Sequence, residues 1–170
     1  MTNNDLLGIL NELFAIEKFS LASYLRYASP WSKPNDEPLR KVIRQIGDEQ
    51  QHFADRIGWF VVEHRGHVKG GSFPLRFTAF NDLSLDYLAR RVMEDQEWII
   101  REVRVCVSKL AGAPIAHSLA LEVLDAEQAH LDRLAEMHDS CTSDAIRPTI
   151  ATARNEICCG NPKAIVTTAA

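Results

Sequence analysis

Apolar residues recur every three or four positions through most of the chain, the spacing that places them along one face of an α-helix. Stretches with this pattern run from Asn4 to Ala28, from Pro38 to Arg65, from just after Asp82 to near Gly112, and from Pro114 to His138. No long alternation of apolar and polar residues, which would indicate a half-buried strand, competes with them. The pattern predicts an all-α protein built from these helices.

The breaks between the stretches predict how the helices are connected. Ser29-Pro30 ends the first helix, because proline restricts its predecessor and cannot continue a helix. Ala113-Pro114 makes another short turn. The connection from Gly66 to Asp82 is much longer than most loops, so it can cross from one end of a bundle to the other. We expect a four-helix bundle over residues 1–138, with one long crossover that makes the second and third helices parallel.

Residues 139–170 are expected to form a C-terminal extension. Pro148, Gly160 and Pro162 interrupt it, which leaves room for a short fifth helix around Thr149–Ile157 and a loose tail. The adjacent Cys158 and Cys159 are interpreted as tail residues.

Composition excludes several classes of protein. Of the 170 residues, 46% are hydrophobic and 25% are charged, which is ordinary for a globular domain. A formal net charge of −4 argues against a nucleic-acid binder. No apolar run is long enough to span a membrane, and the first residues lack a signal peptide pattern, so we expect a cytoplasmic protein. The four cysteines form no Cys-x-x-Cys pair, which argues against a rubredoxin-type iron site.

Acidic residues fall where the apolar faces should be most buried. Glu17, Glu49 and Glu127 lie at the centre of the stripes of the first, second and fourth helices. An ionised carboxylate in a dry core costs several kcal/mol unless it is paired or bound to a metal. Arg56 is the cation closest to such a central position, and a core satisfied by Arg56, Tyr24 and waters is the alternative to a bound metal.

Two histidines strengthen the metal interpretation. Glu49 and His52, like Glu127 and His130, are three residues apart, which places carboxylate and imidazole on one helix face, one turn apart. Oxygen ligands combined with imidazoles suit iron or manganese, with zinc as an alternative. The pattern therefore predicts a metal site inside the bundle.

These residues resemble the ferritin-like superfamily, particularly bacterioferritin and rubrerythrin. The resemblance covers about residues 5–138 and rests on Glu17 followed by Tyr24, on Glu49-x-x-His52 followed by Ala54-Asp55-Arg56, and on the segment Leu121–Leu131. It implies a ferritin-like bundle that holds two iron ions. Glu49 and Glu127 would bridge the metals, and Glu17 would be a terminal ligand.

The third helix departs from the family pattern, which has a glutamate here. Gln96 lies close to the centre of its apolar stripe and is our candidate ligand, with Asp95, Glu94 and Glu97 as alternatives. With Gln96 the protein would supply three negative charges rather than four, so one metal would bind more weakly or the site would hold a single metal.

Three further residues bear on what the site could hold or contact. Gln50 stands where bacterioferritin has its haem-ligating methionine, so no haem is expected there. Tyr24 is a candidate hydrogen-bond donor to a ligand carboxylate, and His138 a candidate neighbour of the ligands.

The resemblance implies a ferroxidase or iron-storage protein, or an oxidoreductase that detoxifies peroxide, with metal ions and O2 or peroxide as its partners. Alternatives are a di-iron oxygenase acting on an organic substrate, with the Phe73–Phe80 crossover as its lid, and a non-catalytic metal-binding bundle. A homo-oligomer, at least a dimer, is expected, and Trp98, Val105 and Phe19 are candidates for its interface.

Overall fold

The computed structural model describes residues 1–28, 33, 36–81 and 83–145, and for 139–145 it describes the helical backbone. Its helices are α1 (Asn3–Lys18), α2 (Leu21–Leu25), α3 (Glu37–Glu63), α4 (Leu85–Lys109) and α5 (Pro114–Ala145), and the 3₁₀ helix η2 (Leu75–Phe80) lies in the crossover. The described residues contain no strand, which confirms the prediction of an all-α protein.

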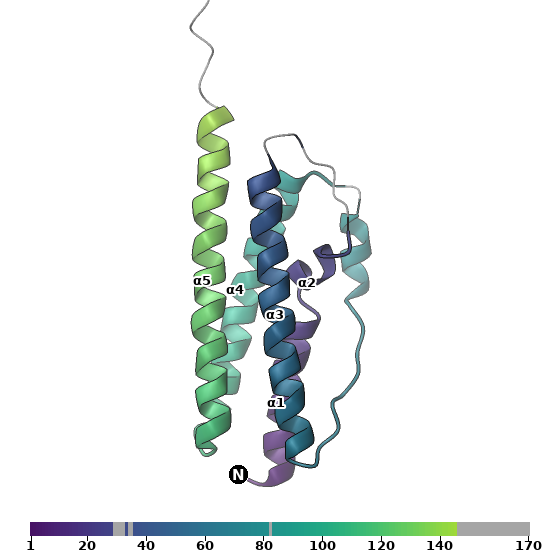
Figure 1. Ribbon diagram of the computed structural model, residues 1–170, viewed down its shortest axis with the longest axis vertical. Helices are drawn as coiled ribbons and strands as arrows, with labels where there is room; N and C mark the ends of the chain where they lie inside the picture. The colour runs from purple at the N-terminus through teal and green to yellow at the C-terminus, as the bar shows by residue number, and fades with distance from the viewer. Residues whose placement is uncertain (29–32, 34–35, 82, 146–170) are drawn as a thin grey trace, which may run out of the picture.

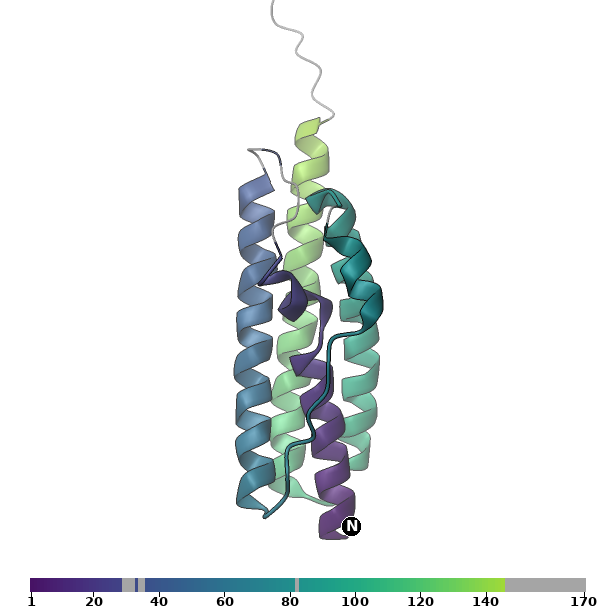
Figure 2. The ribbon, with the colours of Figure 1, turned by 90° about the vertical axis from the view of Figure 1, so that its right-hand side faces the viewer.

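The long helices form one bundle with the predicted topology (Figures 1 and 2). α1 and α5 run in one direction, and α3 and α4 run in the other. The crossover returns along the outside of the bundle from the end of α3 to the start of α4, as the length of the connection predicted. α1 packs against α3 and α4, and α5 packs against the same two helices.

The first predicted helix is divided in two, so the expectation of one continuous helix over Asn4–Ala28 is wrong. α1 ends at Lys18, and Ser20 starts α2 as its N-cap, accepting a hydrogen bond from the Ser23 N–H over 3.0 Å. The Leu21 N–H donates to Asp95 on α4 over 2.8 Å. α2 then lies tightly against α3 at Gly47, where a Cβ atom would come within 2.8 Å of the Ala22 carbonyl oxygen.

The last helix is longer than the apolar pattern predicted. α5 continues past His138 to Ala145. The expected fifth helix at Thr149–Ile157, together with Cys158 and Cys159, lies outside the described residues. In the part of the chain that the structure describes, no helix is long and apolar enough to cross a membrane.

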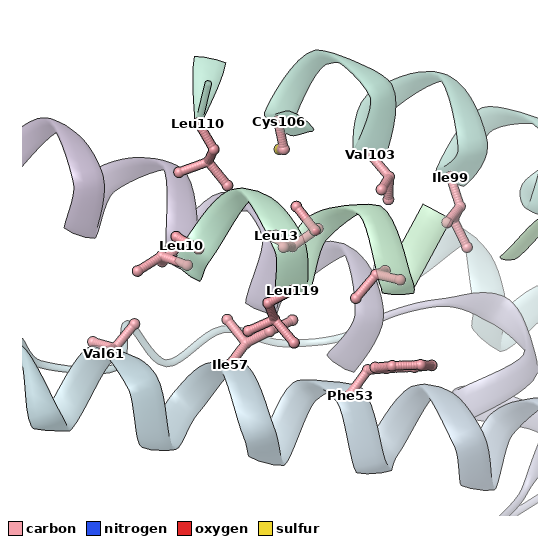
Figure 3. Close-up of a cluster of buried hydrophobic side chains, with 13 residues drawn as sticks. Leu10, Leu13, Phe53, Ile57, Val61, Ile99, Val103, Cys106, Leu110 and Leu119 are labelled. Carbon is pink, nitrogen blue, oxygen red and sulfur yellow. The ribbon is translucent and has the colours of Figure 1, made fainter. Parts of the chain in front are cut away.

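The hydrophobic core is divided into two clusters along the bundle axis. The lower core, drawn in Figure 3, lies between the middle of α1, the second halves of α3 and α4, and the start of α5. It consists of Leu10, Leu13, Phe53, Ile57, Val61, Ile99, Val103, Cys106, Leu110, Ala116, Leu119, Ala120 and Val123. The upper core lies between α2, the starts of α3 and α4, the crossover and α5. It consists of Leu21, Ala22, Leu25, Leu39, Ile43, Ile46, Phe77, Leu85, Leu88, Ala89, Val92 and Leu134.

Candidate metal centre

A layer of buried polar side chains separates the two cores. It is made by Glu17 on α1, Gln50 on α3, Gln96 on α4, and Glu127 and His130 on α5, and each of these is at most 1% exposed. Each helix places its polar residue on the same stripe as its apolar residues. On α3, for example, Gln50 follows Ile46 by one turn and precedes Phe53 by another. We call these five residues the polar layer.

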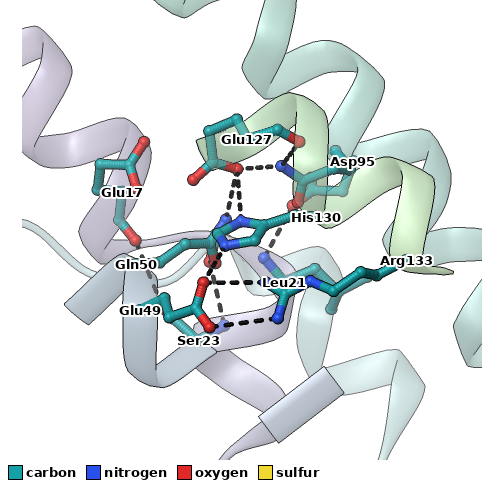
Figure 4. Close-up of polar contacts among 11 residues, drawn as sticks. Glu17, Leu21, Ser23, Glu49, Gln50, Asp95, Glu127, His130 and Arg133 are labelled. Atoms are coloured by element: carbon teal, nitrogen blue, oxygen red, sulfur yellow. Dashed lines mark hydrogen bonds and ion pairs between the residues drawn. The ribbon is translucent and has the colours of Figure 1, made fainter. Parts of the chain in front are cut away.

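Glu127 is the centre of the hydrogen bonds in this layer (Figure 4). Its Oε2 accepts from Gln50 Nε2 over 3.1 Å and from Gln96 Nε2, and Gln96 also donates to the Glu127 backbone carbonyl over 3.2 Å. The Ser20 hydroxyl donates to Gln50 Oε1 over 2.6 Å, which orients the amide so that its NH₂ group faces Glu127. The N-cap of α2 therefore also positions a donor of the polar layer.

Glu17 has no such partners. Its side chain is fully buried, and neither carboxylate oxygen has a hydrogen-bond partner among the described residues. Burial raises the pKa of Glu17 well above its ordinary value, and the neighbouring carboxylate of Glu127 raises it further. Without a bound cation, this site therefore favours a protonated Glu17.

His130 connects the buried layer to Glu49 at its edge. Its Nε2–H donates to Glu49 Oε2 over 2.7 Å, whereas its Nδ1 lies 3.4 Å from Glu127 Oε2 and has no hydrogen-bond partner in the part of the chain that the structure describes. Burial alone would lower the pKa of His130, but the two carboxylates outweigh it and the pKa is raised.

Arg133, one turn beyond His130 on α5, also binds Glu49. Its two terminal nitrogens donate to the two carboxylate oxygens over 2.9 and 3.3 Å. Partial burial would raise the pKa of Glu49, but Arg133 and His130 lower it below its ordinary value. Glu49 is thus held in its ionised form by Arg133 and His130.

The structure brings together most of the predicted ligands but not all of them. Glu17, Gln96, Glu127 and His130 meet in the polar layer, with Glu49 at its edge. The buried placement predicted for Gln96 is confirmed, whereas the alternatives Glu94 and Glu97 are exposed and Asp95 accepts the Leu21 N–H.

His52 is not brought into this group. The buried face of α3 includes Ile46, Gln50 and Phe53, so Gln50 takes the central position that we expected for Glu49. His52 is consequently exposed on the outer face of the helix. Glu49 and His52 lie on one face of the helix, as their spacing predicts. The centre of the buried face, however, is Gln50 and not Glu49.

The expected neighbours of the site also lie elsewhere. The Tyr24 hydroxyl donates to Asn81 over 2.7 Å, in the crossover rather than in the polar layer. His138 lies with its Nε2 3.8 Å from Asp86 on α4. Arg56 binds Glu122 with both terminal nitrogens near the surface, over 2.6 and 2.7 Å, so it does not compensate the buried carboxylates.

Sequence reasoning missed three residues of this network. The signal that could have identified Gln50 is its place between Ile46 and Phe53, one helix turn from each. Arg133 follows His130 by three residues, the same spacing that drew attention to the two Glu-x-x-His pairs. Ser20 carries only the weak signal of a good N-cap inside an apolar stretch.

The donor set of the layer fits a cation, although its side chains do not form a complete metal site as they stand. In the described part of the chain, no group of three or more His, Cys, Asp or Glu side chains is arranged to hold a metal ion. Yet four buried atoms of the layer lack hydrogen-bond partners: Glu17 Oε1 and Oε2, Glu127 Oε1 and His130 Nδ1. Carboxylate oxygens and imidazole nitrogens are the ligands that iron, manganese and zinc accept.

Comparisons with known proteins agree with the architecture. No family model and no curated protein matches the chain. Among solved structures, it is similar to a two-domain protein from Anabaena variabilis ATCC 29413 that contains DJ-1/ThiJ/PfpI-like and ferritin-like domains. The TM-score is 0.64 at 15% sequence identity, covering 92% of this chain, which spans 42% of the length of that protein. This likeness, with the helix arrangement described above, shows that the chain has a ferritin-like helical-bundle fold.

Proposed function

We propose that this chain is a metal-binding bundle that holds one divalent cation between Glu17, Glu127 and His130. The observation that carries the proposal is the set of four buried atoms without hydrogen-bond partners in the polar layer. A buried polar group left without a partner costs about 1–3 kcal/mol. A single cation would satisfy these atoms together and would offset the repulsion between the two buried carboxylates.

The partners of His130 support its role as a ligand. Because Nε2 donates to Glu49, the other ring nitrogen is left facing the buried layer. Ligand histidines commonly use one nitrogen for the metal and fix the ring with the other through a carboxylate. In this proposal Glu49 orients His130, instead of bridging two metals as the family resemblance implied.

The second half of the expected two-iron site has less support. His52 is exposed, Glu49 is bound by Arg133, and the amides of Gln50 and Gln96 donate to Glu127. An amide NH₂ and a guanidinium occupy positions where a second cation would need acceptors. Two bound iron ions therefore remain the alternative that a titration can distinguish.

Iron is the cation we propose, with manganese or zinc as alternatives. When bound, iron would supply one-electron chemistry toward O2 or peroxide, which corresponds to a ferroxidase or a peroxide-reducing oxidoreductase. The chain contributes two carboxylates and one imidazole, held between two apolar cores that exclude water. Because little water reaches such a site, the attraction between the cation and the carboxylates is only weakly screened.

A second candidate is a purely structural layer, and one observation favours it. Gln50 and Gln96 already donate to Glu127, and Arg133 already compensates Glu49. A proton on Glu17 would then leave the two carboxylates balanced by Arg133 and a protonated His130. In this alternative the bundle binds no metal and a proton takes the place of the cation.

Titration of the metal-stripped protein tests the proposal. We expect Fe(II), added without oxygen and followed by calorimetry, to bind at one equivalent, and Mn(II) followed by electron paramagnetic resonance to do the same. Glu17→Gln and Glu127→Gln should each weaken binding by about 100-fold or more, since each removes an anionic ligand. Glu122→Gln is the matched control, because this exposed glutamate lies on α5 and pairs with Arg56.

The results of these experiments distinguish the single metal site from its alternatives. Two equivalents of Fe(II) would contradict the single site and support the two-iron alternative. Binding that survives both Glu17→Gln and Glu127→Gln, or no binding of Fe(II), Mn(II) or Zn(II), would overturn the proposal, the latter in favour of the structural layer. Mixing the Fe(II)-loaded protein with O2 or peroxide in a stopped-flow instrument should oxidise the iron without an added organic substrate. A requirement for such a substrate would indicate the oxygenase alternative.

A further inference from the structure

A cleft of about 610 Å³ lies on the outside of the bundle, beneath the crossover. Its walls are the end of α1, the start of α2, the crossover with η2, and the middle of α4. This volume falls within the usual range for pockets that bind small organic molecules. Trp98 and Phe19, which the sequence suggested for a subunit interface, both line it.

The body of the cleft is aromatic. Phe19, Phe77, Phe80 and Trp98 all line it, and Phe77 is only 2% exposed, so it forms part of the floor. The rings of Phe77 and Phe80 are stacked with their centroids 6.2 Å apart. Flat apolar molecules pack favourably against such rings, which favours a ligand with an aromatic or branched apolar body.

Hydrogen-bonding capacity at the rim indicates the charge of the ligand. Both carboxylates of the cleft are engaged: Asp95 accepts the Leu21 N–H and faces Arg76, and Glu94 pairs with Arg91. Arg76, by contrast, reaches Asp95 only at 3.8 Å, beyond hydrogen-bond distance, and lies over the Phe77 ring. A guanidinium carries five N–H donors, and Arg76 makes no hydrogen bond to any described residue, so its donors are available to an added carboxylate.

We propose that this cleft binds a small organic carboxylate with an aromatic or branched apolar body. The apolar body lies among the four aromatic rings, and the carboxylate accepts hydrogen bonds from Arg76, with Arg91 as the second cationic group at the rim. An oxyanion and a guanidinium form stronger, more directional hydrogen bonds than neutral groups do. This assignment does not depend on a cation in the polar layer.

The cleft and the polar layer share two walls. The last turn of α1 carries Glu17 toward the layer and Ile16 toward the cleft, and α4 carries Gln96 inward and Asp95 outward. A ligand in the cleft would therefore lie against the helix turns that carry two residues of the candidate metal centre. The cleft is nevertheless a separate site from the polar layer.

Binding of 2-naphthoate, measured by calorimetry on the full chain, tests this inference. Two molecules of the same shape serve as probes of charge: uncharged 2-naphthalenemethanol and the cation 2-naphthylmethylammonium. We expect 2-naphthoate to bind at one equivalent and about tenfold or more tightly than either, which is the size of one charge-assisted hydrogen bond. The test is done on metal-stripped protein, so failure of the proposed metal site would leave its result unchanged.

Matched variants locate the site. Arg76→Met should weaken 2-naphthoate binding by about tenfold and leave that of 2-naphthalenemethanol within about twofold, because only the carboxylate uses the guanidinium. Arg101→Met is the control, since this exposed arginine of α4 does not line the cleft. Nuclear Overhauser contacts between the naphthalene ring and the Trp98 indole provide a second, mutation-free measurement in the wild-type protein.

Three results would overturn the inference. The first is equal or tighter binding of the alcohol or the ammonium compound. The second is no saturable binding of 2-naphthoate up to about 1 mM. The third is a concentration-dependent dimer, seen by sedimentation, that buries Trp98 and is dissociated by Trp98→Ser but not by Trp59→Ser, which would make the cleft a contact with a second copy. Trp59 suits this comparison because it is 71% exposed on α3.

Discussion

Arg133 holds the Glu49 carboxylate with both terminal nitrogens, at the edge of a buried layer that contains no other guanidinium among the described residues. This pair stabilises the ionised form of Glu49, which in turn accepts a hydrogen bond from His130. The acidic residue that the family resemblance implied as a metal bridge is thus bound by an arginine of its own chain.

Replacing this arginine should change the ionisation of its partner. In Arg133→Met the pKa of Glu49 should rise toward its ordinary range, because the guanidinium now lowers it. Carboxyl chemical shifts followed through a pH titration by NMR would measure this. Both partners are partly exposed, so unfolding should become easier by only about 0.5–1 kcal/mol. Arg104→Met, on an exposed face of α4, is the control, and an unchanged Glu49 titration would contradict the assigned pairing.

Removing the charge of Glu17 should stabilise the metal-free protein. The folded-state pKa of Glu17 is raised above its ordinary value of 4.5. The contribution of this group to the stability of the wild-type protein is therefore fully present below pH 4.5 and is lost as pH rises through the folded-state pKa. Glu17→Gln lacks this loss, and its amide can donate to the unpartnered Glu127 Oε1. We expect urea unfolding at pH 8 to show a gain of about 1–3 kcal/mol.

The control for this experiment is Glu63→Gln, at the exposed end of α3. It should follow the wild-type dependence on pH. A Glu17→Gln protein that is less stable than wild type at pH 8 would show that the carboxylate has a favourable partner in the metal-free state.

Placing a carboxylate at position 96 of α4, where the family pattern has a glutamate, should have the opposite effect on stability. Gln96→Glu removes a donor to Glu127 and adds a buried negative charge beside it, so the metal-free protein should lose about 2–4 kcal/mol of stability. Divalent cations should restore more of that stability than they add to wild type. Thermal unfolding with and without Mn(II) measures both effects. Gln128→Glu on the exposed face of α5 exchanges a hydrogen bond to Asp132 for a like-charge pair, so it should cost no more than about 0.5 kcal/mol and should gain no extra stability from Mn(II).

The thiol of Cys106 should be unreactive in the folded protein. It is 2% exposed in the lower core, and burial raises its pKa to about 11, so the reactive thiolate is scarce at neutral pH. Iodoacetamide at pH 8, followed by mass spectrometry of the peptide that contains Cys106, should label it only after unfolding in urea. Rapid labelling without urea would indicate that the lower core opens readily.

The sequence was sufficient to predict the bundle because its signals are repeated along each helix. Apart from the turns that carry the polar layer, each turn of α3, α4 and α5 adds another apolar residue to the same face, and the long connection after Gly66 determines that α3 and α4 are parallel. The break between α1 and α2 depends on one N-cap serine and on Asp95, 74 positions away from Leu21, which no local pattern contains.

The candidate site was harder to predict because it depends on the rotation of each helix. On α5 the stripe is unambiguous, and Glu127 and His130 are buried as expected. On α3 the difference between Glu49 and Gln50 is one residue, or about 100° of rotation. That rotation is determined by packing of Gly47 against α2 and of Phe53 in the lower core, neither of which can be inferred from periodicity alone.

Division of the core by the polar layer also determines how substitutions combine. A large-to-small change at Leu13 removes contacts in the lower core, and one at Leu88 removes contacts in the upper core. Among the described residues, the two clusters share no buried apolar side chain. Their energetic effects should therefore be additive, as for well-separated sites. Apolar side chains in one core can therefore be substituted independently of those in the other core, whereas substitutions in the polar layer are constrained by charge.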